Sequence, residues 1–294
     1  MRIHTDAQKC VVFFGVAPPG GDVRYAGTGF FVGIREAGLY FTYLVTARHV
    51  AQGLEAAGDF FVRTNRLNGE AHSIPVHRAE WQYHPDPTVD VAAIKFSFDA
   101  NICDVVCYDL RQTVKRDTIS CGDEAYLVGL FRLHPGASRH TPLVHTGTIA
   151  AVADSRERIP INDKFTGQII LVDGHLVEAQ TLEGLSGAPA FIRQSASLAG
   201  FDADGVMPIA FGSVRLFGLY QGSWDGQPLS VLAEDRKIDH RRVPVGMGIV
   251  VPGEMILELI NDHPLLKKQR SEEIAAVSLP NYILDYGKGP RRSS

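Results

Sequence analysis

Short runs of apolar and β-branched residues recur along the whole chain and are separated by Gly, Pro, Asn and Asp. Such runs are typical of β-strands. Many short strands divided by turn residues favour a β-sandwich or a barrel over alternating strand–helix units. The pattern predicts strands over 10–16, 29–34, 41–46, 59–63, 89–98, 124–130, 143–152, 168–171, 189–192, 214–220 and 247–251.

One segment has a clear helical pattern instead, over 252–261. Glu254 lies in the first turn of that helix, where a negative charge suits the helix dipole. The helix should pack its apolar face across the second half of the β structure. The residues that share this face at helical spacing are Met255, Ile256, Leu259 and Ile260.

Composition narrows the class of protein. The chain has 294 residues, is 45% hydrophobic and has a net charge of −4, so it can bury a sizeable core and gives no electrostatic reason to bind nucleic acid. It has no apolar run near the length of about 20 residues that a bilayer requires, so we expect no membrane association. Residues 1–9 are polar and lack the apolar core of a secretory signal. We therefore expect a cytoplasmic protein.

The cysteines agree with that expectation. The four, Cys10, Cys103, Cys107 and Cys121, lie away from the motifs described below. Cysteine is among the most often buried residue types, and disulfides need an oxidising compartment. We interpret all four as free thiols.

Three chemically distinctive residues occur in a fixed order along the chain. His49 ends a Val-Thr-Ala-Arg-His run, Asp90 opens an Asp-Val-Ala-Ala-Ile run, and Ser186 lies within Gly-Leu-Ser-Gly-Ala-Pro. The order His, Asp, Ser is that of chymotrypsin, whereas subtilisins and α/β-hydrolases use other orders. Ala188 and the apolar run after Pro189 also disagree with the Gly-x-Ser-x-Gly turn and helix of α/β-hydrolases.

With these motifs, residues 8–262 resemble the trypsin/chymotrypsin superfamily in its bacterial HtrA-like, trypsin-like peptidase branch, without a PDZ domain. The segments that carry the resemblance are 27–32, 43–50, 90–95, 184–189, 216–220 and 246–252. It implies an all-β fold of two six-stranded antiparallel barrels with a C-terminal helix. It also implies a short helical turn over 49–56, after the histidine motif. The expected boundaries are 1–264 for the protease unit, about 8–110 for barrel one, 110–122 for a linker, about 122–262 for barrel two and 265–294 for a tail.

The resemblance assigns roles to the three motifs. Ser186 is the nucleophile, His49 is the general base, and Asp90 orients the imidazole. The backbone N–H groups of Gly184 and Ser186 form the oxyanion hole. Asp86 is a rival for the third role, but it lies between two prolines in a turn-forming run, so we favour Asp90.

The specificity pocket is implied by the same resemblance. Its floor should be Gln180, with Thr181 beside it, and its wall should come from Tyr220, Gln221, Gly222 and Ser223. The floor lacks an acidic residue, so a preference for Arg or Lys is not expected. A neutral pocket narrowed by Tyr220 would suit a small or medium side chain.

One departure from the family pattern bears on regulation. Leu185 stands where activated trypsins carry the aspartate that pairs with a freed N-terminus, so activation by propeptide cleavage is not expected. Because the sequence offers no visible replacement for that ion pair, the Gly184 peptide is predicted to flip in a latent resting state. The apolar patch at 282–286 is a candidate regulator.

The sequence thus predicts a serine endopeptidase that is regulated or restricted to few substrates. It acts on a protein or peptide substrate, with an activating protein partner as a further expectation. The histidine spacing suggests no metal site, and the chemistry needs no cofactor. The alternative is a catalytically silent trypsin-like scaffold that binds a protein partner.

Overall fold

The first half of the chain forms one eight-stranded sheet in the computed structural model, which describes residues 5–17, 20–162, 167–180, 183–193, 214–226 and 243–278. The strands follow the order β5-β4-β1-β2-β3-β7-β6, all antiparallel, and β8 pairs in parallel with β2. Their bounds are β1 (Val11–Val16), β2 (Arg24–Glu36), β3 (Leu39–Thr46), β4 (Phe60–Asn65), β5 (Ala71–Val76), β6 (Gln82–Tyr83), β7 (Ala92–Lys95) and β8 (Tyr108–Asp109).

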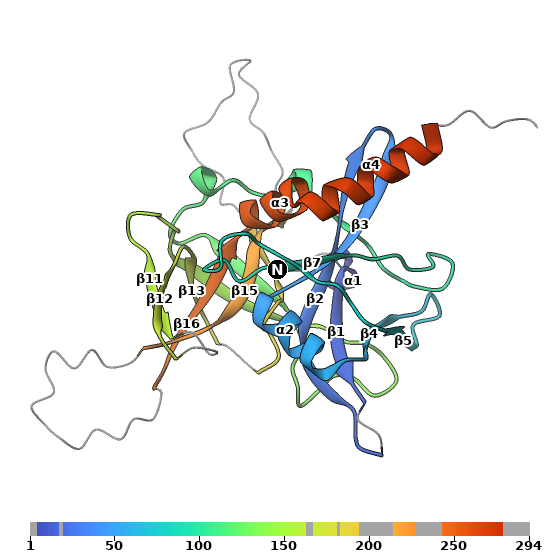
Figure 1. Ribbon diagram of the computed structural model, residues 1–294. Helices are drawn as coiled ribbons and strands as arrows, with labels where there is room; N and C mark the ends of the chain where they lie inside the picture. The colour runs from blue at the N-terminus through green and yellow to red at the C-terminus, as the bar shows by residue number, and fades with distance from the viewer. Residues whose placement is uncertain are drawn as a thin grey trace, which may run out of the picture.

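The second half forms a closed barrel in the order β10-β13-β16-β15-β14-β9. Its strands are β9 (Glu124–Gly129), β10 (Leu143–Ala151), β13 (His175–Ala179), β14 (Pro189–Arg193), β15 (Arg215–Gly226) and β16 (Val243–Pro252). A separate hairpin of β11 (Ile159–Asn162) and β12 (Ile169–Val172) lies between β10 and β13 in the chain. Figure 1 shows the barrel on the left and the first sheet on the right.

The fold is mostly β with a C-terminal helix, as predicted in outline, but only one of the two expected barrels closes. In the first unit, closure would have to join the two edge strands of the sheet, β5 and β6. Edge strand β5 contains Pro75, which has no N–H to donate to a neighbour, and β6 is only two residues long. With only two residues, β6 is too short to pair along β5, and the sheet stays open.

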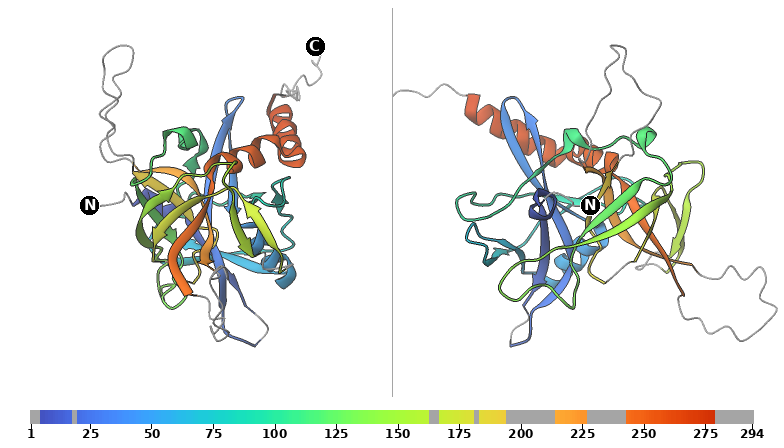
Figure 2. Two further views of the ribbon diagram at one scale, coloured as in Figure 1. Left: turned by 90° about the vertical axis from the view of Figure 1, so that its left-hand side faces the viewer. Right: turned by 180° about the vertical axis from the view of Figure 1, so that it is seen from behind.

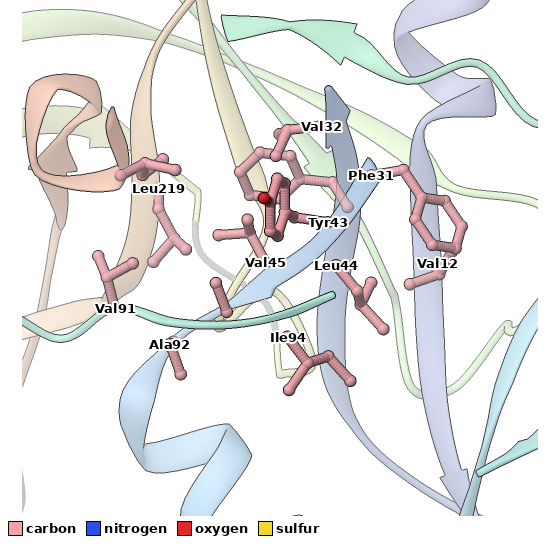
Figure 3. Close-up of a cluster of buried hydrophobic side chains, with 14 of the residues drawn as sticks. Val12, Phe31, Val32, Tyr43, Leu44, Val45, Val91, Ala92, Ile94 and Leu219 are labelled. Atoms are coloured by element: carbon pink, nitrogen blue, oxygen red, sulfur yellow. The ribbon is translucent and has the colours of Figure 1, made fainter. Parts of the chain in front are cut away.

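A continuous apolar core joins the two units. Its buried residues include Phe31, Leu44 and Ile94 of the first sheet and Leu219 of β15 in the barrel. Figure 3 shows Leu219 beside the side chains of β3 and the β7 segment. A second cluster, with Leu127, fills the barrel interior. The shared core fixes how the two units face each other, and so fixes the position of residues at their boundary.

The helical turn predicted after β3 is present as α2 (Arg48–Ala57). It buries Val50, Ala51 and Leu54 on one face, which packs it against the sheet. It ends at Gly58, whose φ of 87° is readily adopted only by glycine and whose N–H binds the carbonyls of Leu54 and Glu55. The first turn of α2 therefore points at the boundary between the units (Figure 1).

The predicted C-terminal helix is α3 (Gly253–Asp262), and it buries Ile256, Leu259 and Ile260 as expected. It contacts β15 and β16 of the barrel and also β7 of the first sheet. A second helix, α4 (Pro264–Ser278), follows directly and was not predicted, because its apolar residues are not grouped on one face. Figure 2 shows α4 running past the first sheet.

A buried arginine anchors α4. The Arg270 side chain is 3% exposed, and its Nε lies 2.6 Å from Glu36 Oε2. Its Nη1 donates to the Tyr43 hydroxyl at 3.0 Å and to the Ile260 carbonyl at 2.7 Å. These contacts compensate the burial of the charge and hold the start of the expected tail against the first sheet.

The connection between the units is mostly irregular. It contains two single 3₁₀ turns, Leu110–Gln112 and Arg116–Thr118. A further short helix, α1 (Asp6–Lys9), precedes β1. None of the helices in the described ranges is long and apolar enough to cross a membrane.

Candidate functional site

His49, Asp90 and Ser186 come from three separate segments that meet at the boundary between the units. His49 is the second residue of α2, Asp90 lies two residues before β7, and Ser186 lies in the turn before β14. Strands β3 and β7 are paired, with Thr46 opposite Ala92, so the segments that carry His49 and Asp90 leave the sheet side by side.

The Asp90 carboxylate binds His49 through both oxygens. Oδ2 lies 2.7 Å from His49 Nδ1, and Oδ1 accepts the backbone N–H of His49 at 3.0 Å. That N–H belongs to the first turn of α2, where backbone donors have no partner within the helix. With Nδ1–H donating to the carboxylate, Nε2 is left as the basic nitrogen of the ring. Both side chains are largely buried, at 20% and 11% exposed.

Asp86 is occupied elsewhere. Its Oδ1 accepts the N–H of Thr88 at 2.8 Å and the hydroxyl of Thr88 at 2.7 Å, as in a turn. Partial burial acts to raise the pKa of Asp86, but the hydrogen bonds from Thr88 and the nearby His84 hold it below its ordinary value. Of the two candidate aspartates, the structure brings Asp90 to His49.

The turn that carries Ser186 depends on two glycines. Gly184 and Gly187 have φ values of 105° and 86°, which side chains rarely tolerate. A Cβ on Gly187 would also lie 2.2 Å from the carbonyl oxygen of Thr28. The Gly187 N–H donates to the Tyr220 carbonyl at 2.8 Å, which ties the turn to β15.

Ser186 and His49 line one open pocket of about 210 Å³. No hydrogen bond joins the His49 ring to the Ser186 hydroxyl among the described residues. Hydrogen bonds of this kind are often long without substrate and tighten when it binds. The other residues that line the pocket are Ala26, Val50, Gly53, Arg132 and Gly184.

Thr28 holds the Ser186 turn from the side of the first sheet. Its N–H donates to the Ser186 carbonyl at 3.0 Å, and its hydroxyl donates to the Gly184 carbonyl at 2.7 Å. The same hydroxyl accepts the N–H of Leu130 at 3.0 Å. Thr28 is fully buried, so these bonds are made away from water. They fix the turn on both sides of Leu185, which is itself buried.

The Glu183–Gly184 peptide has a further contact. The Glu183 carbonyl accepts the N–H of Arg132 at 3.3 Å. Because the carbonyl and N–H of a trans peptide point in opposite directions, the Gly184 N–H is turned away from Arg132. Within the described ranges, neither the Gly184 N–H nor the Ser186 N–H donates to another group. Among the described residues, the turn that carries Ser186 therefore has two backbone donors without an acceptor.

The residues predicted to form the specificity pocket are only partly placed. Gln180 is exposed just after β13, and Thr181 lies outside the described residues. Tyr220 is 2% exposed within the barrel core, and its hydroxyl lies 3.4 Å from Ser223 Oγ. Gln221 and Gly222 continue β15, and the buried Gln221 Oε1 has no hydrogen-bond partner among the described residues. The preference inferred from these residues stays a prediction.

Among the described segments, two of the three other buried histidines, His140 and His175, lie in structural positions. His140 contacts the Phe13 ring, and its Nε2 lies 2.8 Å from the Val11 carbonyl. His175 Nδ1 accepts the N–H of Ala153 at 3.1 Å. Burial is the main cause that lowers the pKa of His140 to about 3 and that of His175 to about 4. In the part of the chain that the structure describes, no cluster of three or more His, Cys, Asp or Glu side chains could hold a metal ion.

Sequence reasoning missed Thr28 and Arg132 as residues of the site. Thr28 lies inside segment 27–32, which carries part of the resemblance, but its sequence setting does not reveal the hydroxyl contacts 102 and 156 residues away. Arg132 follows β9 in a loop without any recognised motif.

The chain is similar to known trypsin-like peptidases. The model of the trypsin-like peptidase domain family matches residues 27–200. No curated protein gives a significant match. Among solved structures, the Rv3671c protease from M. tuberculosis in its active form is 18% identical, with a TM-score of 0.45 over 86% of this chain and 80% of that chain. Its inactive form is 16% identical, with a TM-score of 0.45 over 86% of this chain and 88% of that chain.

Proposed function

Because the chain belongs to the trypsin-like peptidase family, we propose that it is a serine endopeptidase with Ser186 as its nucleophile. The observation that carries this proposal is the two-point contact between Asp90 and His49, on the wall of the pocket that also contains Ser186. Family membership supports hydrolysis of proteins or peptides, and the contact supports the assignment of roles within the site.

In the proposed acylation step, Ser186 Oγ attacks the carbonyl carbon of the scissile bond while His49 Nε2 takes the hydroxyl proton. Asp90 keeps the ring in the tautomer that leaves Nε2 basic, and its charge stabilises the imidazolium that forms. His49 then returns the proton to the departing amine, which leaves an ester on Ser186. A water molecule, activated by His49 in the same way, attacks this ester and releases the second product.

The negative charge that develops on the substrate oxygen needs donors that are already in place. The free N–H groups of Gly184 and Ser186 are the proposed donors. Losing one donor of this kind lowers the rate by about 10²–10³. The contacts from Thr28 and Arg132 support a turn that is ordered before substrate binds.

This ordering changes the expectation about regulation. The sequence offered no replacement for the missing ion pair at Leu185, and a flipped resting state was expected on that ground. The Thr28 hydroxyl holds the carbonyl of the Gly184–Leu185 peptide, and the Arg132 N–H holds the carbonyl of the Glu183–Gly184 peptide. We therefore propose that activity is restricted by substrate recognition rather than by a disordered turn. The patch at 282–286 lies outside the described residues, and an activating partner stays a prediction.

The alternative function is a trypsin-like scaffold that binds a protein and cuts little. A fluorophosphonate probe separates the two, because it reacts only with an activated serine and needs no knowledge of the substrate. We expect the natural chain to be labelled, and we expect Ser186→Ala and His49→Ala to abolish labelling while both variants keep the native circular dichroism spectrum. A natural chain that is folded and unlabelled would favour the scaffold.

A further inference from the structure

The pocket beside Ser186 carries a fixed positive charge. Among the described residues that line it, Arg132 is the one permanently charged side chain, and no acidic side chain lines it. The Arg132 side chain is 45% exposed, so its guanidinium is accessible from solvent. A carboxylate that entered the pocket would meet a cation beside Ser186 and His49.

The guanidinium is held in position by backbone groups. Its Nε donates to the Tyr25 carbonyl at 3.1 Å, and its Nη2 contacts the Ala26 carbonyl at 3.4 Å. Nη1 contacts Glu183 Oε2 at 3.3 Å. An arginine has five N–H donors, so one donor on each terminal nitrogen is left for a ligand. Two donors in a planar fork suit a carboxylate.

Glu183 is a weak competitor for this charge. Its side chain is 84% exposed, and exposed ion pairs contribute little to stability. A substrate carboxylate can bind the remaining donors or displace Glu183 without breaking the contacts to Tyr25 and Ala26. Arg132 is thus anchored on one side and available on the other.

The position of the pocket decides which part of a substrate would reach Arg132. None of its lining residues comes from β15, which binds the Ser186 turn through the backbone of Tyr220. Under the proposed function, the acyl half of the substrate lies toward β15, where the predicted specificity residues are. The pocket formed by Ala26, Gly53 and Arg132 is then left for the half that departs as the amine.

We infer that Arg132 selects substrates with an acidic side chain just after the scissile bond. This inference rests on the proposed function, since it assigns the two sides of Ser186 to the two halves of a peptide substrate. It narrows the substrate class to peptides or proteins with Asp or Glu on the leaving side.

The test compares matched peptides. A randomised peptide library, with products read by mass spectrometry, first identifies a sequence that the natural chain cleaves. Two quenched fluorogenic peptides are then made from it, with Glu or Gln at the first position after the cleaved bond. The measured quantity is the ratio of kcat/KM for the two peptides, which is independent of the active fraction of each preparation.

We expect kcat/KM of the natural chain to be about tenfold higher for the Glu peptide than for the Gln peptide. This factor is at the lower end of the effect expected from a hydrogen bond to a charged group. Arg132→Gln should bring the ratio to about one, and Arg132→Lys should give an intermediate value because it keeps the charge without the fork. Glu183→Gln is the matched control, because it changes the residue that pairs with Arg132. It should raise the ratio by removing the competing carboxylate.

Two results would overturn the inference: equal cleavage of both peptides by the natural chain, or a Glu preference that survives in Arg132→Gln. The proposed function would still stand in either case if the fluorophosphonate probe labels the chain. If the natural chain neither reacts with the probe nor cleaves any library member, the proposed function fails and this inference fails with it.

Discussion

Replacing Thr28 by valine removes one hydroxyl and keeps the shape of the side chain. The Gly184 carbonyl then loses a donor at 2.7 Å, and the Leu130 N–H loses an acceptor at 3.0 Å. Thr28 and Leu130 are fully buried, so water cannot easily take the place of the hydroxyl. Each buried group left without a partner costs about 1–3 kcal/mol.

The protein can reduce this cost by rotating the peptides next to Gly184 so that the carbonyl finds water. The carbonyl that rotates belongs to the Gly184–Leu185 peptide, and the Gly184 N–H belongs to the preceding peptide. The two peptides share the Gly184 Cα, so we propose that the rotation also displaces this N–H from the oxyanion hole, and losing one donor lowers the rate by about 10²–10³. We expect Thr28→Val to lower the fluorophosphonate labelling rate by about that factor. The free energy of unfolding should fall by about 2 kcal/mol or more.

Two control variants separate the effect of the lost hydroxyl contacts to the Ser186 turn from a general loss of stability. Thr28→Ser keeps the hydroxyl and should label within a few-fold of the natural chain. Thr46→Val removes another buried hydroxyl, which donates to the Thr28 carbonyl at 2.7 Å but does not contact Gly184. It should lower stability by about 1–3 kcal/mol while changing the labelling rate much less. A folded Thr28→Val protein that labels at the natural rate would refute the proposed role of this hydroxyl.

Three further predictions address the aspartates, the histidines and the thiols. Asp90→Asn should lower the labelling rate by about 10⁴, because the His49 ring is no longer held in the tautomer that leaves Nε2 basic. Asp86→Asn should change the labelling rate by less than about tenfold. Similar losses in both variants would contradict the assignment of Asp90. A histidine in the unfolded chain binds a proton near pH 6.5, whereas in the folded chain His140 and His175 have pKa values of about 3 and about 4. Because the unfolded state binds the extra protons first, the folded state loses stability as the pH falls below 6.5. At pH 5 each histidine should lower the free energy of unfolding by about 2 kcal/mol, and denaturant titrations should show a smaller loss in His175→Asn; an equal loss there would argue against this cause. All four cysteines should react with a thiol reagent in denaturant without prior reduction, because they are free thiols in the structure. Two unreactive thiols would indicate a disulfide and would count against a cytoplasmic protein.

The sequence was sufficient for most of the β structure, and it singled out three motif residues that lie together in the structure. Strands such as β1 and β9 are short apolar runs between turn residues, and this local pattern survives in the fold. The segments of His49, Asp90 and Ser186 stand out because each combines a reactive residue with an unusual local setting. The structure brings His49 to Asp90 and places Ser186 in the same pocket.

Other features could not be predicted because they depend on contacts between distant segments. The helix α4 has charged residues on every face, and its position depends on Arg270 reaching Glu36, 234 residues away. The open first sheet follows from the short β6, which pairs with β7 through only two residues. The Thr28 and Arg132 contacts involve backbone carbonyl and N–H groups, which every residue has, and these leave no pattern in the sequence.

The central claim is that Ser186 is activated by His49 and Asp90. The most direct measurement is the mass of the natural chain after exposure to a fluorophosphonate, followed by peptide mapping of the product. The proposed mechanism predicts one added phosphonyl group per chain, located on Ser186, and no addition when the chain is unfolded before exposure. An unmodified folded chain, or an adduct on any residue other than Ser186, would contradict it.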